Sequence, residues 1–237
     1  MTVHAGEKGN ISVLPHVLKK QRLGVAGTRL GRRSMFKCHL SQDSFAETYV
    51  PDLHAIADQL NTARSDLYHI PLPVIIELLA KLGKRIIADG GRFQKDGISY
   101  IGLWLRKQNL EEICRINYTN PDVADQYVEI RPHVQMMAQP RGIVCHWIAA
   151  NIPSLGIFSL VLGLLSKNAS LVKVPPENVE LISWILEKLQ GISVTWNGTE
   201  YSGNTLVNTI ALVSFPGKNV ALSSVFSLAA DCRIIYG

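Results

Sequence analysis

The sequence lacks the residue spacings with which proteins commonly bind zinc or nucleotide phosphates. Its four cysteines form no C-x-x-C pair, and its seven histidines form no H-x-x-x-H pair. We therefore expect no metal site. Neither G-x-G-x-x-G nor the Walker A pattern occurs, so a nucleotide bound by this chain must be held without either common phosphate loop.

The cysteines are few and scattered, at Cys38, Cys114, Cys145 and Cys232. Apolar surroundings such as GIVCHWIA are typical of small buried side chains rather than of reactive or cross-linked thiols. The N-terminus also lacks the apolar segment of a secretory signal. These features predict a reducing compartment and a cytoplasmic location.

Acidic residues are scarce at the start of the chain. Residues 1–40 carry eight lysines and arginines against one acid, Glu7, whereas the remaining residues carry 16 basic and 18 acidic groups. This contrast predicts a basic N-terminal arm over residues 1–40. Such an arm could bind nucleic acid or anionic lipid or act as a transit peptide, but a solvated terminus is the simpler interpretation. Because aromatic residues do not interleave with its charges, we expect no nucleic-acid partner.

The middle of the chain has the periodicity of helices. Apolar residues from Leu53 to Leu67 recur every three or four positions, and PLPVIIELLAKLGKRIIADGG places Pro73 near a helix start and two glycines at its end. In NLEEICRIN, Asn109 is a candidate N-cap. Residues 41–137 are therefore expected to form a helical N-terminal subdomain.

Strands and helices alternate in the last hundred residues. Short β-branched runs predict strands in RGIVCHWIAA, ASLVKV, TIALVSF and CRIIY, and the intervening segments predict helices, with residues 192–208 holding an extra strand and a loop. This order predicts an α/β fold, a doubly wound parallel sheet with helices on both faces, over residues 138–237. Residues 143–165 form a segment without a charged side chain. This segment is long enough to cross a bilayer. The polar and proline residues within it argue against a membrane span.

Two polar residues follow neighbouring strands of the expected sheet. Asn151 comes just after the first strand, and Lys173 ends the second. Ligands of open parallel sheets bind beyond the carboxyl ends of the strands. There an amide N–H can stabilise an oxyanion, and an ammonium group can bind a ribose hydroxyl or a phosphate. The structural alternatives are an N-cap or Asx-turn role for Asn151 and a solvated strand end for Lys173.

The run QPRGIVCHWIAANIPSLGIFSLVLGLLSKNASLVKVPP resembles the aldehyde dehydrogenase superfamily. It is most similar to the acyl-CoA reductase branch, the fatty-acid reductases of bacterial luminescence, through Asn-Ile-Pro and the strand Asn168–Lys173. The segments VSFPGKN and AADCRIIYG are also similar to that branch. The resemblance covers residues 138–237 and implies a Rossmann-like, aldehyde dehydrogenase-type cofactor domain.

The resemblance implies NADPH-dependent reduction of an acyl thioester to a fatty aldehyde. Its substrate would be acyl-CoA or an acyl-carrier thioester, with acyl-transferring proteins and a second copy of the chain as candidate partners. Asn151 corresponds to the oxyanion-stabilising residue and Lys173 to the lysine that holds the adenosine ribose or its phosphate. The other cofactor-binding positions implied are Ile148, Ala149, Ala150, Pro175, Tyr236 and Gly237.

Two departures from the family pattern bear on function. Pro176 occupies the place of the acid that follows the family's lysine by three residues, with Glu177 one position later. None of the four cysteines matches the family's nucleophile, which belongs to a second domain. We therefore expect the N-terminal part of such an enzyme, inactive alone. The alternative is a non-catalytic α/β binding module, or a degenerate fragment of an aldehyde dehydrogenase-like protein.

Overall fold

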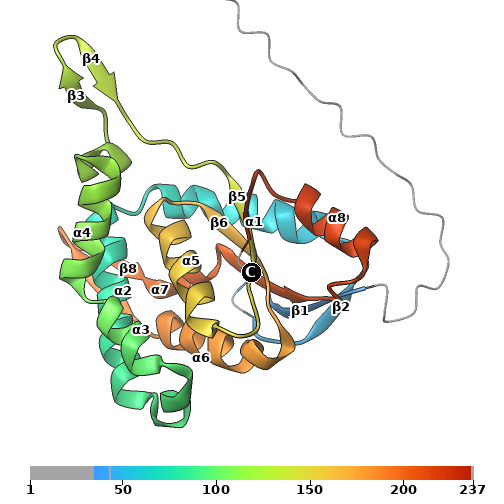
Figure 1. Ribbon diagram of the computed structural model, residues 1–237. Helices are drawn as coiled ribbons and strands as arrows, with labels where there is room; N and C mark the ends of the chain where they lie inside the picture. Colours follow the sequence, from blue (N-terminus) through green and yellow to red (C-terminus); the bar gives the residue numbers. More distant parts are fainter. Residues whose placement is uncertain (1–34, 43, 236–237) are drawn as a thin grey trace, which may run out of the picture.

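A computed structural model describes residues 35–42 and 44–235, and a six-stranded sheet forms its centre (Figure 1). The strand order is β10-β5-β6-β9-β1-β2, and β10, β5, β6 and β9 run parallel. The expected alternation of strands and helices over the last hundred residues is confirmed, with these bounds: β5 Ile143–Trp147, α5 Pro153–Leu165, β6 Ala169–Lys173, η4 Pro176–Asn178, α6 Val179–Gln190, β9 Ile210–Ser214, α8 Val220–Leu228 and β10 Cys232–Ile235.

Both faces of the central strands β5, β6 and β9 are buried, which explains why these strands are mostly apolar. Neighbouring residues of β6 point to opposite sides: Leu171 joins a core cluster with Leu60 and Phe226, whereas Val172 joins the larger cluster with Ile182. Helices α1 and α8 supply one cluster, and α2, α5 and α6 supply the other. The expected doubly wound α/β arrangement is therefore present.

The strand β1, Phe36–Leu40, corrects the predicted boundary of the basic arm. It pairs antiparallel with β9 and with β2, Thr48–Val50. Phe36, Cys38 and Leu40 are buried, so this segment belongs to the sheet although the sequence analysis placed it in the arm. Positive charge over residues 1–40 masked this short strand. Residues 1–34 of the arm lie outside the described residues.

The helical region contains α1 His54–Tyr68, α2 Leu72–Asp89, η2 Gly91–Asp96, α3 Ile98–Trp104, α4 Lys107–Tyr118 and η3 Pro121–Ala124. The predicted stripe is buried at Leu53, Ile56, Leu60 and Leu67. The predicted N-cap is wrong, because α4 has Arg106 as its N-cap and Asn109 lies inside the helix. The Asn109 amide instead donates to the carbonyl of Leu103 at 3.0 Å, tying α4 to the end of α3.

Two hairpins complete the fold. The first pairs β3 Val128–Arg131 with β4 Val134–Met136 and projects away from the sheet in Figure 1. The second pairs β7 Ser193–Trp196 with β8 Thr199–Ser202 and is followed by α7 Gly203–Val207. Residues 192–208 thus hold two strands and a short helix, where one strand and a loop were predicted. The division into arm, helical subdomain and cofactor domain stays a prediction.

The uncharged run 143–165 is divided between two elements. Strand β5 ends at Trp147 and α5 begins at Pro153, with a turn between them. Among residues 35–42 and 44–235, no helix has both the length and the apolar character that a bilayer crossing requires.

Candidate functional site

The ends of β5 and β6 meet at one rim of the sheet. Trp147 pairs with Lys173, and the amide of Ile148 donates to the carbonyl of Lys173 at 3.3 Å. Asn151 lies four residues beyond Trp147, in the turn that leads into α5. The structure therefore places Asn151 and Lys173 after adjacent parallel strands, where such sheets present their ligand-binding groups.

The Asn151 side chain is exposed and does not cap α5. The N-cap residue is Ile152, with no side-chain hydrogen bond, and the helix is started by Pro153 at its first turn. Within the described residues, the Asn151 carboxamide contacts no hydrogen-bond partner. This geometry argues against the cap and Asx-turn alternatives and leaves the amide N–H free to donate to a ligand.

The Lys173 ammonium group lies over two aromatic rings. Its Nζ is 5.5 Å from the centroid of Trp147 and 5.3 Å from that of Phe215. Burial lowers the pKa of Lys173, and in the part of the chain that the structure describes it has no carboxylate partner. A partly buried cation without a counter-ion among the described residues can attract an anionic ligand, which favours ligand binding over the solvated-end alternative.

A pocket of about 620 Å³ opens beside Lys173. Four of the residues predicted to bind cofactor line it: Ile148, Ala150, Lys173 and Pro175. Its remaining lining comes from β1, β2, the turn after β6 and the end of β9, with Met35, Lys37, Tyr49, Pro176, Glu177, Ser214, Phe215, Pro216 and Gly217. Asn151 and Ala149 lie next to the pocket in sequence but do not line it. Tyr236 and Gly237 lie outside the described residues.

Asn178 fixes the backbone of the turn after β5, a role that the sequence analysis missed. Its side chain is buried, and Nδ2 donates to the carbonyls of Ala149 and Ala150, at 3.3 Å each. The segment thus held leads directly to Asn151. The sequence signal for this role was a polar residue that follows two prolines at the start of an amphipathic helix. The carbonyls that Asn178 contacts, however, lie 28 and 29 residues away in the sequence.

His39, which was also not predicted from the sequence, connects β1 with β9 at the same rim. The Nε2 atom of His39 lies 2.5 Å from Ser214 Oγ, and its Nδ1 lies 3.3 Å from Glu47 Oε1. The same carboxylate contacts Lys37 Nζ at 2.6 Å. Burial is the main cause of the lowered pKa of His39, with Lys37 adding to it. Through its contact with Ser214, the buried imidazole connects β1 with β9.

The cysteines are not arranged for nucleophilic chemistry. Cys38, Cys114 and Cys145 are buried, and desolvation raises the pKa of each thiol, that of Cys114 to about 11. Cys232 is half-buried in β10, and no cysteine lines the pocket beside Lys173. Over the described residues, no cluster of histidine, cysteine and acidic side chains is positioned to hold a metal ion.

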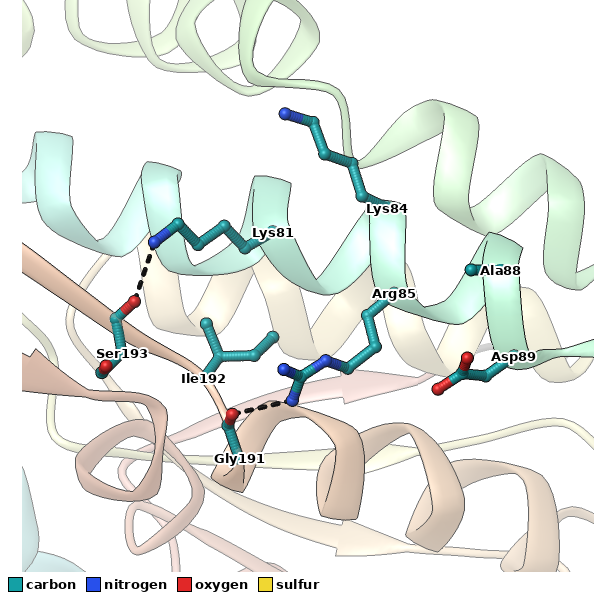
Figure 2. Close-up of a pocket in the computed structure, with 8 residues that line it drawn as sticks. All are labelled: Lys81, Lys84, Arg85, Ala88, Asp89, Gly191, Ile192 and Ser193. Carbon is teal, nitrogen blue, oxygen red and sulfur yellow. Dashed lines mark hydrogen bonds between the residues drawn. The ribbon is translucent and has the colours of Figure 1, made fainter.

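A second pocket, of about 580 Å³, lies between α2 and the connection from α6 to β7 (Figure 2). Two of its cations donate to backbone carbonyls: Lys81 to Ser193 at 2.9 Å and Arg85 to Gly191 at 2.7 Å. These contacts fasten α2 to the end of α6. The pocket contains none of the residues predicted to bind cofactor, and Lys81 and Arg85 have a structural role there.

Fold and site together define an α/β domain with an ammonium group, an exposed amide and a pocket gathered at one strand-end rim. The family model for acyl-CoA reductase (LuxC) matches residues 71–237. This match covers more than half of the chain, and the chain belongs to that family of oxidoreductases. A search of curated proteins gave no match.

Solved structures of aldehyde dehydrogenases are similar to this chain at low sequence identity. A 3,6-anhydro-L-galactose dehydrogenase is 17% identical, with a TM-score of 0.47 over 84% of this chain and 43% of its own. A benzaldehyde dehydrogenase from Corynebacterium glutamicum is 15% identical, with a TM-score of 0.48 over 89% and 48%. The glyceraldehyde-3-phosphate dehydrogenase GapN from Methanocaldococcus jannaschii is 13% identical, with a TM-score of 0.46 over 87% and 50%. This chain thus spans half or less of each of them.

Proposed function

We propose that this chain is the cofactor-binding part of an NADPH-dependent acyl-CoA reductase, which converts an acyl thioester to a fatty aldehyde. The observation that carries the proposal is the Lys173 ammonium group, which has no carboxylate partner among residues 35–42 and 44–235 and is half-buried in the pocket at the carboxyl ends of β5 and β6. Family membership supplies the reaction class, and the geometry of the rim supports a dinucleotide as its ligand.

The residues of the rim fit such a cofactor. Lys173 can donate to a ribose hydroxyl or a phosphate oxygen, while Pro175 and Ile148 offer apolar walls. The turn at Ala149 and Ala150, held by Asn178, gives a fixed backbone edge for the nicotinamide side. When bound, the cofactor supplies the hydride that reduces the acyl group. Tyr236 and Gly237 are proposed to face its pyrophosphate.

Asn151 is the residue that we propose acts on the reacting carbonyl. Its exposed amide can donate to the negative charge that develops on the carbonyl oxygen, and the neighbouring Asn178 contacts limit movement of the turn. Such preorganised donors contribute about 3 kcal/mol to transition-state stabilisation. The acyl group itself is taken by a cysteine thiolate, and we propose that this cysteine is not one of the four in this chain, so that the chain alone is inactive.

The proposal extends to the partners of this chain and to its location. An acyl-transferring protein, a carrier-protein thioester and a second copy of this chain are the candidate partners, and cysteine usage still favours the cytoplasm. A non-catalytic binding module is the alternative function. It differs from the reductase in one measurable property, because a module whose dinucleotide site has decayed does not bind NADPH.

Calorimetric titration of the 237-residue chain with NADPH tests this proposal. We expect saturable binding that Lys173→Ala weakens by about tenfold or more, since one charge-assisted hydrogen bond is lost. Lys107→Ala, which removes an exposed lysine paired with Glu77 at 3.2 Å, is the matched control. Absence of binding at millimolar NADPH, or equal affinity in wild type and Lys173→Ala, would contradict the assignment.

A further inference from the structure

The pocket beside Lys173 contains a second lysine, Lys37 of β1. The two lysines come from strands on either side of β9: Lys37 pairs with Ser214, and Lys173 pairs with Val213. Their backbones are therefore separated by two strand spacings, about 10 Å. Both side chains line the pocket, so two ammonium groups border one cavity.

The position of Lys37 is fixed by its neighbours. Its Nζ lies 2.6 Å from Glu47 Oε1, and the same carboxylate lies 3.3 Å from Nδ1 of His39. His39 in turn contacts Ser214, the residue opposite Lys37 in β9. The Glu47 side chain is 57% exposed, so solvent screens its attraction for Lys37. A phosphate in the pocket can therefore compete for this ammonium group.

The charges that line the pocket favour a phosphate over a hydroxyl group. Among the described residues of the lining, Lys37 and Lys173 face one carboxylate, Glu177, which is exposed to solvent. Glu47, the ion-pair partner of Lys37, is not part of the lining. Dinucleotide sites that select a free ribose 2′-hydroxyl use a carboxylate to accept its hydrogen bond, whereas sites for a 2′-phosphate use a cation. Here Pro176 follows Lys173 by three residues and has no side-chain acceptor.

We infer that Lys37 is a specificity-determining residue, which binds the 2′-phosphate of the adenosine ribose together with Lys173 and thereby selects NADPH over NADH. The inference rests on the proposed function, because it requires a dinucleotide in this pocket. It adds a residue from β1, a segment that precedes the part of the chain matched by the family model.

The test uses adenosine 2′,5′-bisphosphate and adenosine 5′-monophosphate as probes, which differ only in the 2′-phosphate. Dissociation constants are measured by calorimetry for the full chain and for Lys37→Gln. We expect Lys37→Gln to weaken binding of the bisphosphate by about tenfold, the loss of one charge-assisted contact, and binding of the monophosphate by less than about twofold. Lys37→Arg keeps the charge and is expected to retain the preference.

Lys107→Gln is the matched control, since Lys107 is also a half-exposed lysine paired with a glutamate but lies outside the pocket. Glu47→Gln frees Lys37 without removing it, and is expected to leave the preference equal or greater. An unchanged ratio of the two dissociation constants in Lys37→Gln overturns the inference and leaves the proposed function intact. If the wild-type chain binds neither probe nor NADPH, the proposed function fails and the inference fails with it.

Discussion

Trp147 and Lys173 face each other across adjacent parallel strands, with the ammonium group 5.5 Å from the indole centroid. A cation over an aromatic face is stabilised without being neutralised. Burial lowers the pKa of Lys173, and this lysine lacks a carboxylate partner within the described residues. This arrangement keeps one positive charge available to an anionic ligand at the rim.

Cofactor affinity should depend on pH through Lys173. Because burial lowers the pKa of this lysine, it loses its proton at a lower pH than an exposed lysine does. We expect NADPH affinity to fall as the pH rises from neutral into the alkaline range. Calorimetry across that range checks this, with Lys173→Arg as the variant that stays charged. An equally steep fall in Lys173→Arg would show that another group is responsible.

Substitution by alanine should destabilise the fold at Asn178 but hardly at Asn151. Asn178→Ala leaves the carbonyls of Ala149 and Ala150 without their buried donor, which costs about 1–2 kcal/mol of unfolding free energy. Asn151→Ala removes an exposed amide and should change stability by less than about 0.5 kcal/mol. Urea denaturation of both variants makes the comparison. A large loss in Asn151→Ala would mean that its side chain supports the turn rather than a ligand.

Stability should fall in mild acid because of His146. This residue is fully buried, with Nδ1 2.6 Å from Ser159 Oγ and Nε2 3.2 Å from Ser170 Oγ, and desolvation lowers its pKa to about 4. Between the ordinary histidine pKa and that value, the unfolded chain binds a proton that the folded chain does not. The folded state is therefore destabilised as the pH falls through this window, by up to about 3 kcal/mol.

The check is the free energy of unfolding as a function of pH in wild type and His146→Gln. The substitution should flatten the curve between about pH 6.5 and pH 4, where the proton uptake occurs. His54→Gln, at an exposed position, should leave the decline in place. A wild-type curve that coincides in shape with that of His146→Gln would contradict the role given to this residue.

Gly142 should not tolerate a side chain. Its φ is +129°, and an added Cβ would lie 2.1 Å from Oδ2 of Asp231, the atom that accepts the amide of Ile143 at 2.9 Å. Gly142→Ala therefore strains the backbone and disturbs the bond that joins the start of β5 to the start of β10. We expect a loss of about 2–3 kcal/mol.

Gly198→Ala separates the two causes of that loss. Gly198 has a φ of +80° but no atom within 4 Å of an added Cβ, so only the backbone term applies, about 1 kcal/mol. Thermal unfolding of the two variants is the measurement. Equal losses would show that the Asp231 contact contributes nothing.

The sequence predicted those elements whose signals are local. Strands β5, β6, β9 and β10 follow from apolar β-branched runs, and their helices follow from period and from Pro and Gly boundaries. Strand β1 was missed because its partner, β9, lies far along the chain and its five residues stand within a basic segment. Local sequence does not encode such a long-range pairing.

In the site, too, local signals could be predicted from the sequence and long-range contacts could not. The topology of parallel strands was sufficient to predict that Asn151 and Lys173 emerge at one rim, as they do. The residues that support this rim were not predicted, since Asn178 and the pair His39 and Ser214 act through contacts between distant segments. The functional roles of all these residues stay predictions.

The most direct test of the central claim is a crystal structure of the 237-residue chain with NADPH bound. We expect a ribose hydroxyl or phosphate oxygen within hydrogen-bonding distance of Lys173 Nζ, in the pocket that Ile148 and Pro175 also line. A dinucleotide bound elsewhere on the molecule, with this pocket empty at saturating NADPH, would contradict it.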